Sequence, residues 1–144
     1  LCAVLYKPNL RTPFATFIYK NIYKSMFMTD FSAASTEFLA SVATDEHMFA
    51  ETLAFVETWY DFTPTAFRNG DVSNQVDQNQ GSAKVFALSQ LLDMSKEQTL
   101  GCFGEHYRDV LATPEIDNHH NLRRVLREGN GNIEFDQFPL KAKA

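Results

Sequence analysis

Residues 60–70 read YDFTPTAFRNG and lie between two stretches with helical periodicity. Pro64 stops a helix, because its ring removes a backbone donor and restricts the preceding residue to extended conformations. Asn69 and Gly70 both tolerate the positive φ angles of a type I′ turn, the strongest short signal for a β-hairpin. The segment therefore predicts a change from helix to sheet at this point of the chain.

The hairpin would have its arms at 66–68 and 71–73. A single helical turn over 63–66, closed by Gly70 in the left-handed region, is the competing interpretation. We prefer the hairpin. Every residue type in this loop has a structural role, so we interpret the loop as scaffold, with the wall of a pocket as the alternative.

Outside the loop, apolar residues recur at helical spacing in five segments. The predicted helices are 30–42, with Thr29-Asp30 as its N-cap signal, one starting at Thr44, one from Ser82 to Leu92, 95–111 and 118–128. Residues 133–135 alternate as a strand that 138–140 could pair with, and 74–81 reads as a polar loop. The sum predicts an α+β fold, about five helices packed with a small antiparallel sheet or hairpins in a single domain.

The charge distribution is uneven along the chain. Residues 1–27 contain four of the 13 basic residues and none of the 18 acidic ones, so this segment carries +4 and residues 28–144 carry −9. A basic, acid-poor N-terminal segment is typical of a tail or a targeting peptide. We interpret 1–27 as lying outside the domain, either as upstream reading frame or as a targeting segment, and 28–144 as the domain itself.

Composition also limits the partners. The acidic body repels phosphate backbones, and no stretch is long and apolar enough to span a bilayer, so we expect neither a nucleic-acid nor a membrane partner. Cys2 and Cys102 form no disulfide framework, which fits a reducing compartment. These features favour a soluble cytoplasmic protein.

No strong catalytic motif is present. The chain lacks H-E-x-x-H, C-x-x-C, G-x-S-x-G and the P-loop pattern. Gly81-Ser82 at a helix start would leave N–H groups free for an anion, with Lys84 adding charge, although Ser82 as an ordinary N-cap explains the same residues. We predict no cofactor and no metal.

His119 is the best candidate ligand if a metal does bind. Adjacent helical residues point about 100° apart, so His119 and His120 cannot easily grip one ion. His119 shares a face with Leu122 and could instead reach the interior as a hydrogen-bonded side chain, with Arg123 nearby for a carboxylate or phosphate. The candidate ligand-binding residues are polar side chains of these features and of the 60–70 loop. They are Thr63, Thr65, Asn69, Asn79, Ser82, Lys84, His119 and Arg123.

Four blocks in order, YDFTPTAFRNG, NQGSAKVFA, QTLGCFGEHYRDVL and HHNLR, resemble the HopJ (HopPmaJ) type III effector family. The resemblance covers residues 29–143, and family members typically start near the equivalent of Met28. The chain departs from the family at Ala83, where a Cys is usual, and at Asn130, where an aromatic residue is usual. The resemblance implies a bacterial effector-like protein without an assigned catalytic mechanism, with delivery into a host cell implied by the family name.

We therefore expect a HopJ-like, non-enzymatic domain of unknown biochemical activity that binds a protein partner or a small-molecule ligand. The alternative is a small metal-assisted or His-dependent enzyme with a pocket near His119, Thr63 and Ser82.

Overall fold

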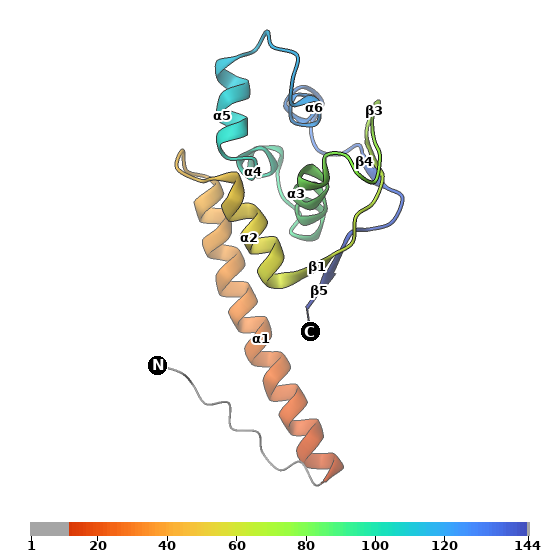
Figure 1. The fold of residues 1–144 in the computed structure, drawn as a ribbon. Coiled ribbons are helices and arrows are strands. Elements are labelled where there is room, and N and C mark those ends of the chain that lie inside the picture. Colours follow the sequence, from red (N-terminus) through yellow and green to blue (C-terminus); the bar gives the residue numbers. More distant parts are fainter. Residues whose placement is uncertain (1–11, 144) are drawn as a thin grey trace. The chain divides into compact units, whose positions relative to one another are not determined.

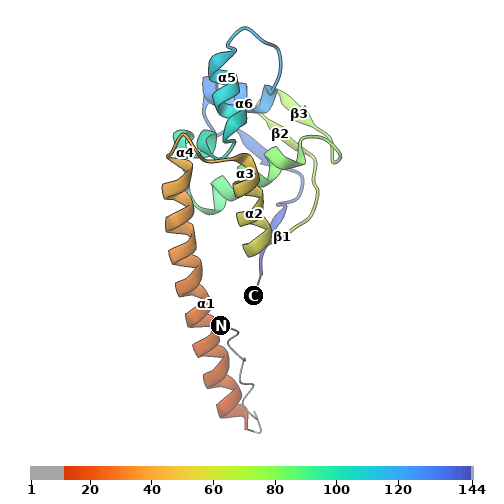
Figure 2. The same ribbon diagram turned by 60° about the vertical axis from the view of Figure 1, so that its left-hand side comes forward.

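The computed structural model describes residues 12–143 (Figures 1 and 2). The chain divides into two compact units; the described residues of the first are 12–34, and the second is 35–143. Helix α1 (Pro13–Val42) begins in the first unit and ends in the second. The residues before 12, which include Cys2 and the first part of the segment 1–27, lie outside the described residues, as does residue 144.

Helix α1 begins well before the predicted start at Asp30. The Thr12 hydroxyl oxygen accepts a hydrogen bond from the Ala15 N–H at 3.1 Å, and Pro13 occupies the first helical position, where its missing N–H is tolerated. The expected N-cap is wrong, because Thr29 and Asp30 lie inside the helix. Between residues 12 and 143, no helix combines the length and the apolar character needed to cross a membrane.

The second unit contains the end of α1, five further helices and five short strands. The helices are α2 (Phe49–Trp59), α3 (Gln80–Leu91), α4 (Lys96–Gly101), α5 (Glu105–Ala112) and α6 (His120–Glu128). The strands are β1 (Tyr60–Phe62), β2 (Phe67–Asn69), β3 (Val72–Asn74), β4 (Ile133–Phe135) and β5 (Leu140–Ala142). The predicted α+β class is confirmed, with one helix more than the five expected.

The strands form two antiparallel sheets, β3-β2-β4 and β1-β5. The predicted hairpin is confirmed in β2 and β3, but each arm lies one residue later than expected. The turn residues are therefore Gly70 and Asp71, with Gly70 at φ 59°, and Asn69 belongs to the strand. The type I′ turn centred on Asn69 and Gly70 is wrong, because burying the Asn69 side chain requires a strand position there.

The predicted return of 138–140 onto 133–135 is also wrong. Strand β4 pairs with β2, placing Phe135 opposite Phe67, and β5 pairs with β1. These longer-range pairings bury Ile133 and Leu140, which are 7% and 6% exposed. Burial of apolar surface outweighs the shorter loop that a local hairpin would need.

Helix α2 begins at Phe49 rather than at the predicted Thr44. The Thr44 hydroxyl instead donates to the Ser41 carbonyl, at the end of α1, at 2.8 Å. The Glu105 carboxylate of α5 accepts the Phe49 N–H at 2.8 Å and so caps α2 from a distant part of the chain. A cap supplied by tertiary structure cannot be inferred from local sequence.

The single helix predicted over 95–111 is two helices, α4 and α5. The capping box at the start is confirmed, because the Ser95 hydroxyl oxygen accepts the Gln98 N–H at 3.1 Å. The chain then breaks at Gly104, whose φ is 54° and where a Cβ would lie 2.5 Å from the Phe49 backbone nitrogen. A Cβ on Gly101 would lie 2.4 Å from the Val42 carbonyl oxygen, so both glycines permit a close approach of another backbone segment.

Helix α3 is the centre of the core, between α2, α4 and the sheets (Figure 1). Its Phe86 ring packs edge-on against Phe67 of β2 and Phe103, with centroid distances of 6.1 and 5.7 Å. Five of its residues are 0% exposed: Ala83, Val85, Phe86, Ala87 and Leu88. A helix enclosed in this way has a fixed N-terminus, and that end forms one side of the site described next.

Candidate functional site

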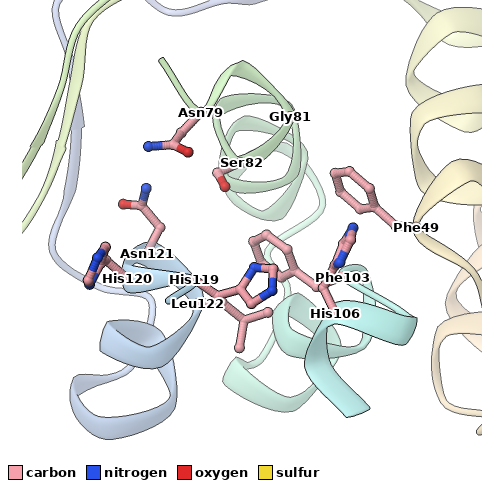
Figure 3. Close-up of a pocket in the computed structure, with 10 residues that line it drawn as sticks. All are labelled: Phe49, Asn79, Gly81, Ser82, Phe103, His106, His119, His120, Asn121 and Leu122. Carbon is pink, nitrogen blue, oxygen red and sulfur yellow. The ribbon is translucent and has the colours of Figure 1, made fainter. Parts of the chain in front are cut away.

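A cavity of about 300 Å³ opens where the N-terminus of α3 faces α5 and the start of α6 (Figure 3). Apolar rings and a leucine form part of its wall, and imidazole, hydroxyl and amide groups form the rest. The residues that line it are Phe49, Asn79, Gly81, Ser82, Phe103, His106, His119, His120, Asn121 and Leu122. Three of the eight predicted ligand-binding residues, Asn79, Ser82 and His119, come together here.

His106 is positioned by the break before α5. Residues 102–104 separate α4 from α5, and the positive φ of Gly104 lets α5 start against α2, where the Glu105 carboxylate caps Phe49. Partial burial raises the pKa of Glu105, but the hydrogen bond from the Phe49 N–H and others outweigh it, so the pKa lies below its usual value. The His106 ring then meets the Phe49 ring edge-on, with centroids 5.0 Å apart.

His119 is the N-cap residue of α6 and has a left-handed backbone, with φ 49° and ψ 47°. Helix α6 thus starts at His120 rather than at the predicted residue 118, and the His119 ring is turned toward α5 (Figure 3). The His119 and His106 ring centroids are 5.2 Å apart, and His119 Nε2 lies 3.8 Å from Asp109 Oδ2. The side chain is 34% exposed, so it is open to a ligand and is not the buried structural histidine considered from sequence.

The first turn of α3 presents free donors to the cavity. Asn79, with φ 51°, is the N-cap, so the interpretation of Ser82 as N-cap is wrong. Ser82 is instead the third residue of the helix, and within the described chain its hydroxyl has no protein hydrogen-bond partner. The N–H groups of Gly81 and Ser82 precede the first intrahelical bond, in which Ala83 donates to the Asn79 carbonyl.

Buried asparagines hold this turn against the sheet and α6. Asn74 Oδ1 accepts from both Asn79 Nδ2 and Asn121 Nδ2 at 2.8 Å. Asn69 Nδ2 donates to the Asn121 carbonyl oxygen at 2.9 Å. The network fixes the relative positions of α3 and α6, the two elements that carry Ser82 and His119.

The other predicted residues lie elsewhere. Thr63 is exposed and its N–H donates to the Pro139 carbonyl at 2.9 Å, whereas Thr65 is buried and its hydroxyl oxygen accepts the Gln137 N–H at 3.1 Å. Lys84 places its ammonium 4.6 Å from the centre of the Phe62 ring. These three side chains do not line the cavity, and Asn69 reaches it only through Asn121.

Arg123 stabilises the residue that precedes His119. Its Nε donates to the Asn118 carbonyl at 2.7 Å and its Nη2 donates to Asn118 Oδ1 at 2.8 Å. These bonds hold the loop that leads directly into His119. Arg123 therefore positions the histidine without lining the cavity.

Sequence reasoning missed most of the apolar wall, because Phe49, Phe103 and Leu122 fit the helical periodicity of ordinary core residues. His106 has no local sequence signal, because its neighbours Phe49 and His119 come from distant parts of the chain. Among residues 12–143, no group of three or more His, Cys, Asp or Glu side chains is arranged to hold a metal ion. Cys102 is 0% exposed, and burial raises the pKa of its thiol to about 12, so it is not a nucleophile at neutral pH.

The family model described as HopJ type III effector protein matches residues 35–140. The chain belongs to the HopJ type III effector protein family. The match begins at the first residue of the second unit and includes every residue that lines the cavity.

A solved structure extends this comparison. The crystal structure described as that of the unknown function protein VPA0580 is 43% identical in sequence, with a TM-score of 0.70. The alignment covers 75% of this chain and 92% of the other chain. No sequence among the curated proteins matches the chain. The family and fold of the HopJ domain are thus shown, and its chemistry must be argued from the cavity.

Proposed function

We propose that this HopJ domain is a binding module that holds a small ligand in the cavity between α3, α5 and α6. The observation that carries the proposal is the composition of the cavity wall. Phe49, Phe103 and Leu122 supply an apolar surface, and the Ser82 hydroxyl and the His119 imidazole converge on it (Figure 3). A concave site of about 300 Å³ in which polar groups converge beside apolar side chains is typical of a small-molecule site.

A binding role without turnover is favoured by the way the reactive groups are connected. Nucleophilic catalysis by serine needs a base within hydrogen-bond reach of the hydroxyl. In the part of the chain from 12 to 143, no hydrogen bond joins Ser82 to His106 or His119. Ser82 thus lacks the base that would activate it.

A His-dependent enzyme is the second candidate, and the contact between His119 and Asp109 favours it. A carboxylate 3.8 Å from an imidazole can orient that ring as a general base. Turnover of any compound by the purified protein, lost in His119→Gln and retained in Thr63→Ala, would establish this alternative and overturn the binding role.

The test of the binding proposal is a thermal-shift screen of the whole chain against common metabolites. A ligand present at about 100 times its Kd stabilises the folded state by about 2.7 kcal/mol, which raises Tm by several degrees. We expect a hit whose Tm shift is reduced in Ser82→Ala. Thr63→Ala is the matched control, because this exposed threonine lies outside the cavity wall.

A hit that stabilises Ser82→Ala and wild type equally, but loses its effect in Thr63→Ala, would move the site to the 60–70 loop. A screen without any hit on folded protein would overturn the small-ligand proposal. A protein partner, sought by pull-down with the whole chain, would then be the remaining binding role.

The family name adds a location to the proposal. The matched family is described as a type III effector protein, so the name supports delivery of this domain into a host cell from the bacterial cytoplasm. A translocation-reporter fusion tests this location. If host cells give no reporter signal while the fusion is present in the bacteria, the protein stays in the bacterial cytoplasm.

A further inference from the structure

We propose that the ligand is an oxyanion, a carboxylate or a phosphate on a small apolar body, and that His106 and His119 bind it with uptake of a proton. The inference rests on the proposed function, because it names the chemistry of the ligand in the same cavity.

The titratable side chains of the cavity wall are all histidines. Within residues 12–143, the wall contains His106, His119 and His120 and no carboxylate, lysine or arginine. As pH falls through the range in which imidazole titrates, such a wall can only gain positive charge. A ligand that exploits this property must be negative.

Carboxylates from α5 and from the segment before α6 lie close to the histidines. From α5, Glu105 Oε1 lies 3.9 Å from His106 Nε2 and Asp109 Oδ2 lies 3.8 Å from His119 Nε2. Before α6, Asp117 Oδ1 lies 3.5 Å from His120 Nδ1. The wall residues from α2 and α3 carry no charge. None of these three acids lines the cavity itself.

The free groups that face the cavity are mainly donors. The Ser82 hydroxyl and the N–H groups of Gly81 and Ser82 have no acceptor among the described residues. Asn121 is 4% exposed and its amide is already engaged by Asn69 and Asn74. A ligand therefore has to bring acceptor atoms, and an oxyanion brings several without any donor.

The spacing of the imidazole pair predicts the proton uptake. The ring centroids of His106 and His119 are 5.2 Å apart, so two imidazolium charges would repel each other at close range. An anion beside both rings removes this repulsion and stabilises the charged forms. Binding and protonation are therefore linked, and affinity falls by about tenfold per pH unit above the histidine range for each proton taken up.

The experiment uses probes that share a ring and differ in charge. Phenyl phosphate and benzoate are the anionic arms, which distinguish a phosphate from a carboxylate, and benzamide is the neutral arm. Each is titrated into the whole chain and followed by the amide NMR signals of Gly81 and Ser82. At about pH 6, we expect an anionic probe to bind at least about tenfold more tightly than benzamide. The same anionic probe should bind at least about tenfold more weakly at about pH 8 than at about pH 6.

Three variants locate the effect. His106→Gln and His119→Gln should each weaken binding of the anionic probe by about tenfold or more and flatten its pH dependence. Thr63→Ala is the matched control, because this exposed threonine lies outside the cavity wall. Amide spectra of all variants verify that each is folded.

The outcomes separate the two proposals. Benzamide binding as tightly as the anions, with the Gly81 and Ser82 signals shifted, would overturn the oxyanion inference and leave the cavity as a ligand site. Anion binding that is independent of pH and of His106 and His119 would overturn it as well. Unmoved signals with every probe, together with a metabolite screen without hits, would overturn both.

Discussion

Replacing Thr52 by valine should destabilise the HopJ domain through hydrogen bonds alone. Thr52 is 0% exposed, and its hydroxyl donates to the Cys102 carbonyl at 2.7 Å. A hydroxyl has one proton, so its contact with His47 Nε2 at 2.8 Å must be one in which the imidazole N–H donates. His47 Nδ1 is then the acceptor for the Ser41 hydroxyl at 2.8 Å. This chain of bonds joins α1, α2 and the residues after α4.

The magnitude follows from what valine leaves behind. The side chain keeps its volume, so no cavity forms, but the His47 N–H and the Cys102 carbonyl lose their partner. An unsatisfied buried polar group costs about 1–3 kcal/mol, so the two together predict a loss of about 2–6 kcal/mol. That is a large fraction of the 5–15 kcal/mol by which domains are typically stable.

The assay is urea denaturation followed by circular dichroism, comparing Thr52→Val with Thr58→Val. Thr58 is on the same helix, is exposed, and donates to the Ala54 carbonyl at 2.8 Å, one turn earlier. Valine there should change the free energy of unfolding by less than about 0.5 kcal/mol. Equal losses in the two variants, or a loss below about 1 kcal/mol in Thr52→Val, would refute the assigned tautomer and network.

Three further predictions follow from single positions. In urea denaturation, Gly104→Ala should lower the free energy of unfolding by more than about 2 kcal/mol, since φ is 54° and a Cβ would lie 2.5 Å from a backbone nitrogen. Gly131→Ala should lower the free energy of unfolding little, because a Cβ there would have no atom within 4 Å. Burial lowers the pKa of His47 below 6.5, so below that pH the unfolded state binds more protons than the folded state. The Tm should therefore decline from about pH 7 to about pH 5, and it should decline less steeply in His47→Gln. Cys102, with a thiol pKa of about 12 and no exposed surface, should resist a thiol reagent in the native protein and react in urea.

The parts of the fold that depend on local chemistry were predictable from sequence. The Ser95 capping box, the hairpin after Pro64 and the stripe of α3 each involve residues close together in the chain, and each is present. The errors arise where a partner from far away decides the outcome. The start of α2 depends on Glu105, and the pairing of β4 depends on β2.

The same distinction holds for the cavity. Asn79, Ser82 and His119 could be chosen from sequence because they are polar residues at predicted helix starts, where free N–H groups can bind an anion. Phe103 and Leu122 could not, since a wall residue and a core residue share the same helical periodicity. Asn74 and Asn121 could not be identified from sequence for another reason: the hydrogen bond between their side chains forms only when the hairpin and α6 meet.

Gly104 connects these observations, because its positive φ is the point at which the predicted helix over 95–111 becomes two. The break lets α5 approach α2, so that Glu105 caps Phe49 and His106 packs against the Phe49 ring. His106 in turn lies beside His119, which has its own left-handed backbone at the start of α6. His106 and His119 therefore stand at or next to positions where local propensity is overridden, and natural sequences break local rules in this way mainly at functional or strained sites. A chain that kept one continuous helix here would have the same residues and no cavity between them.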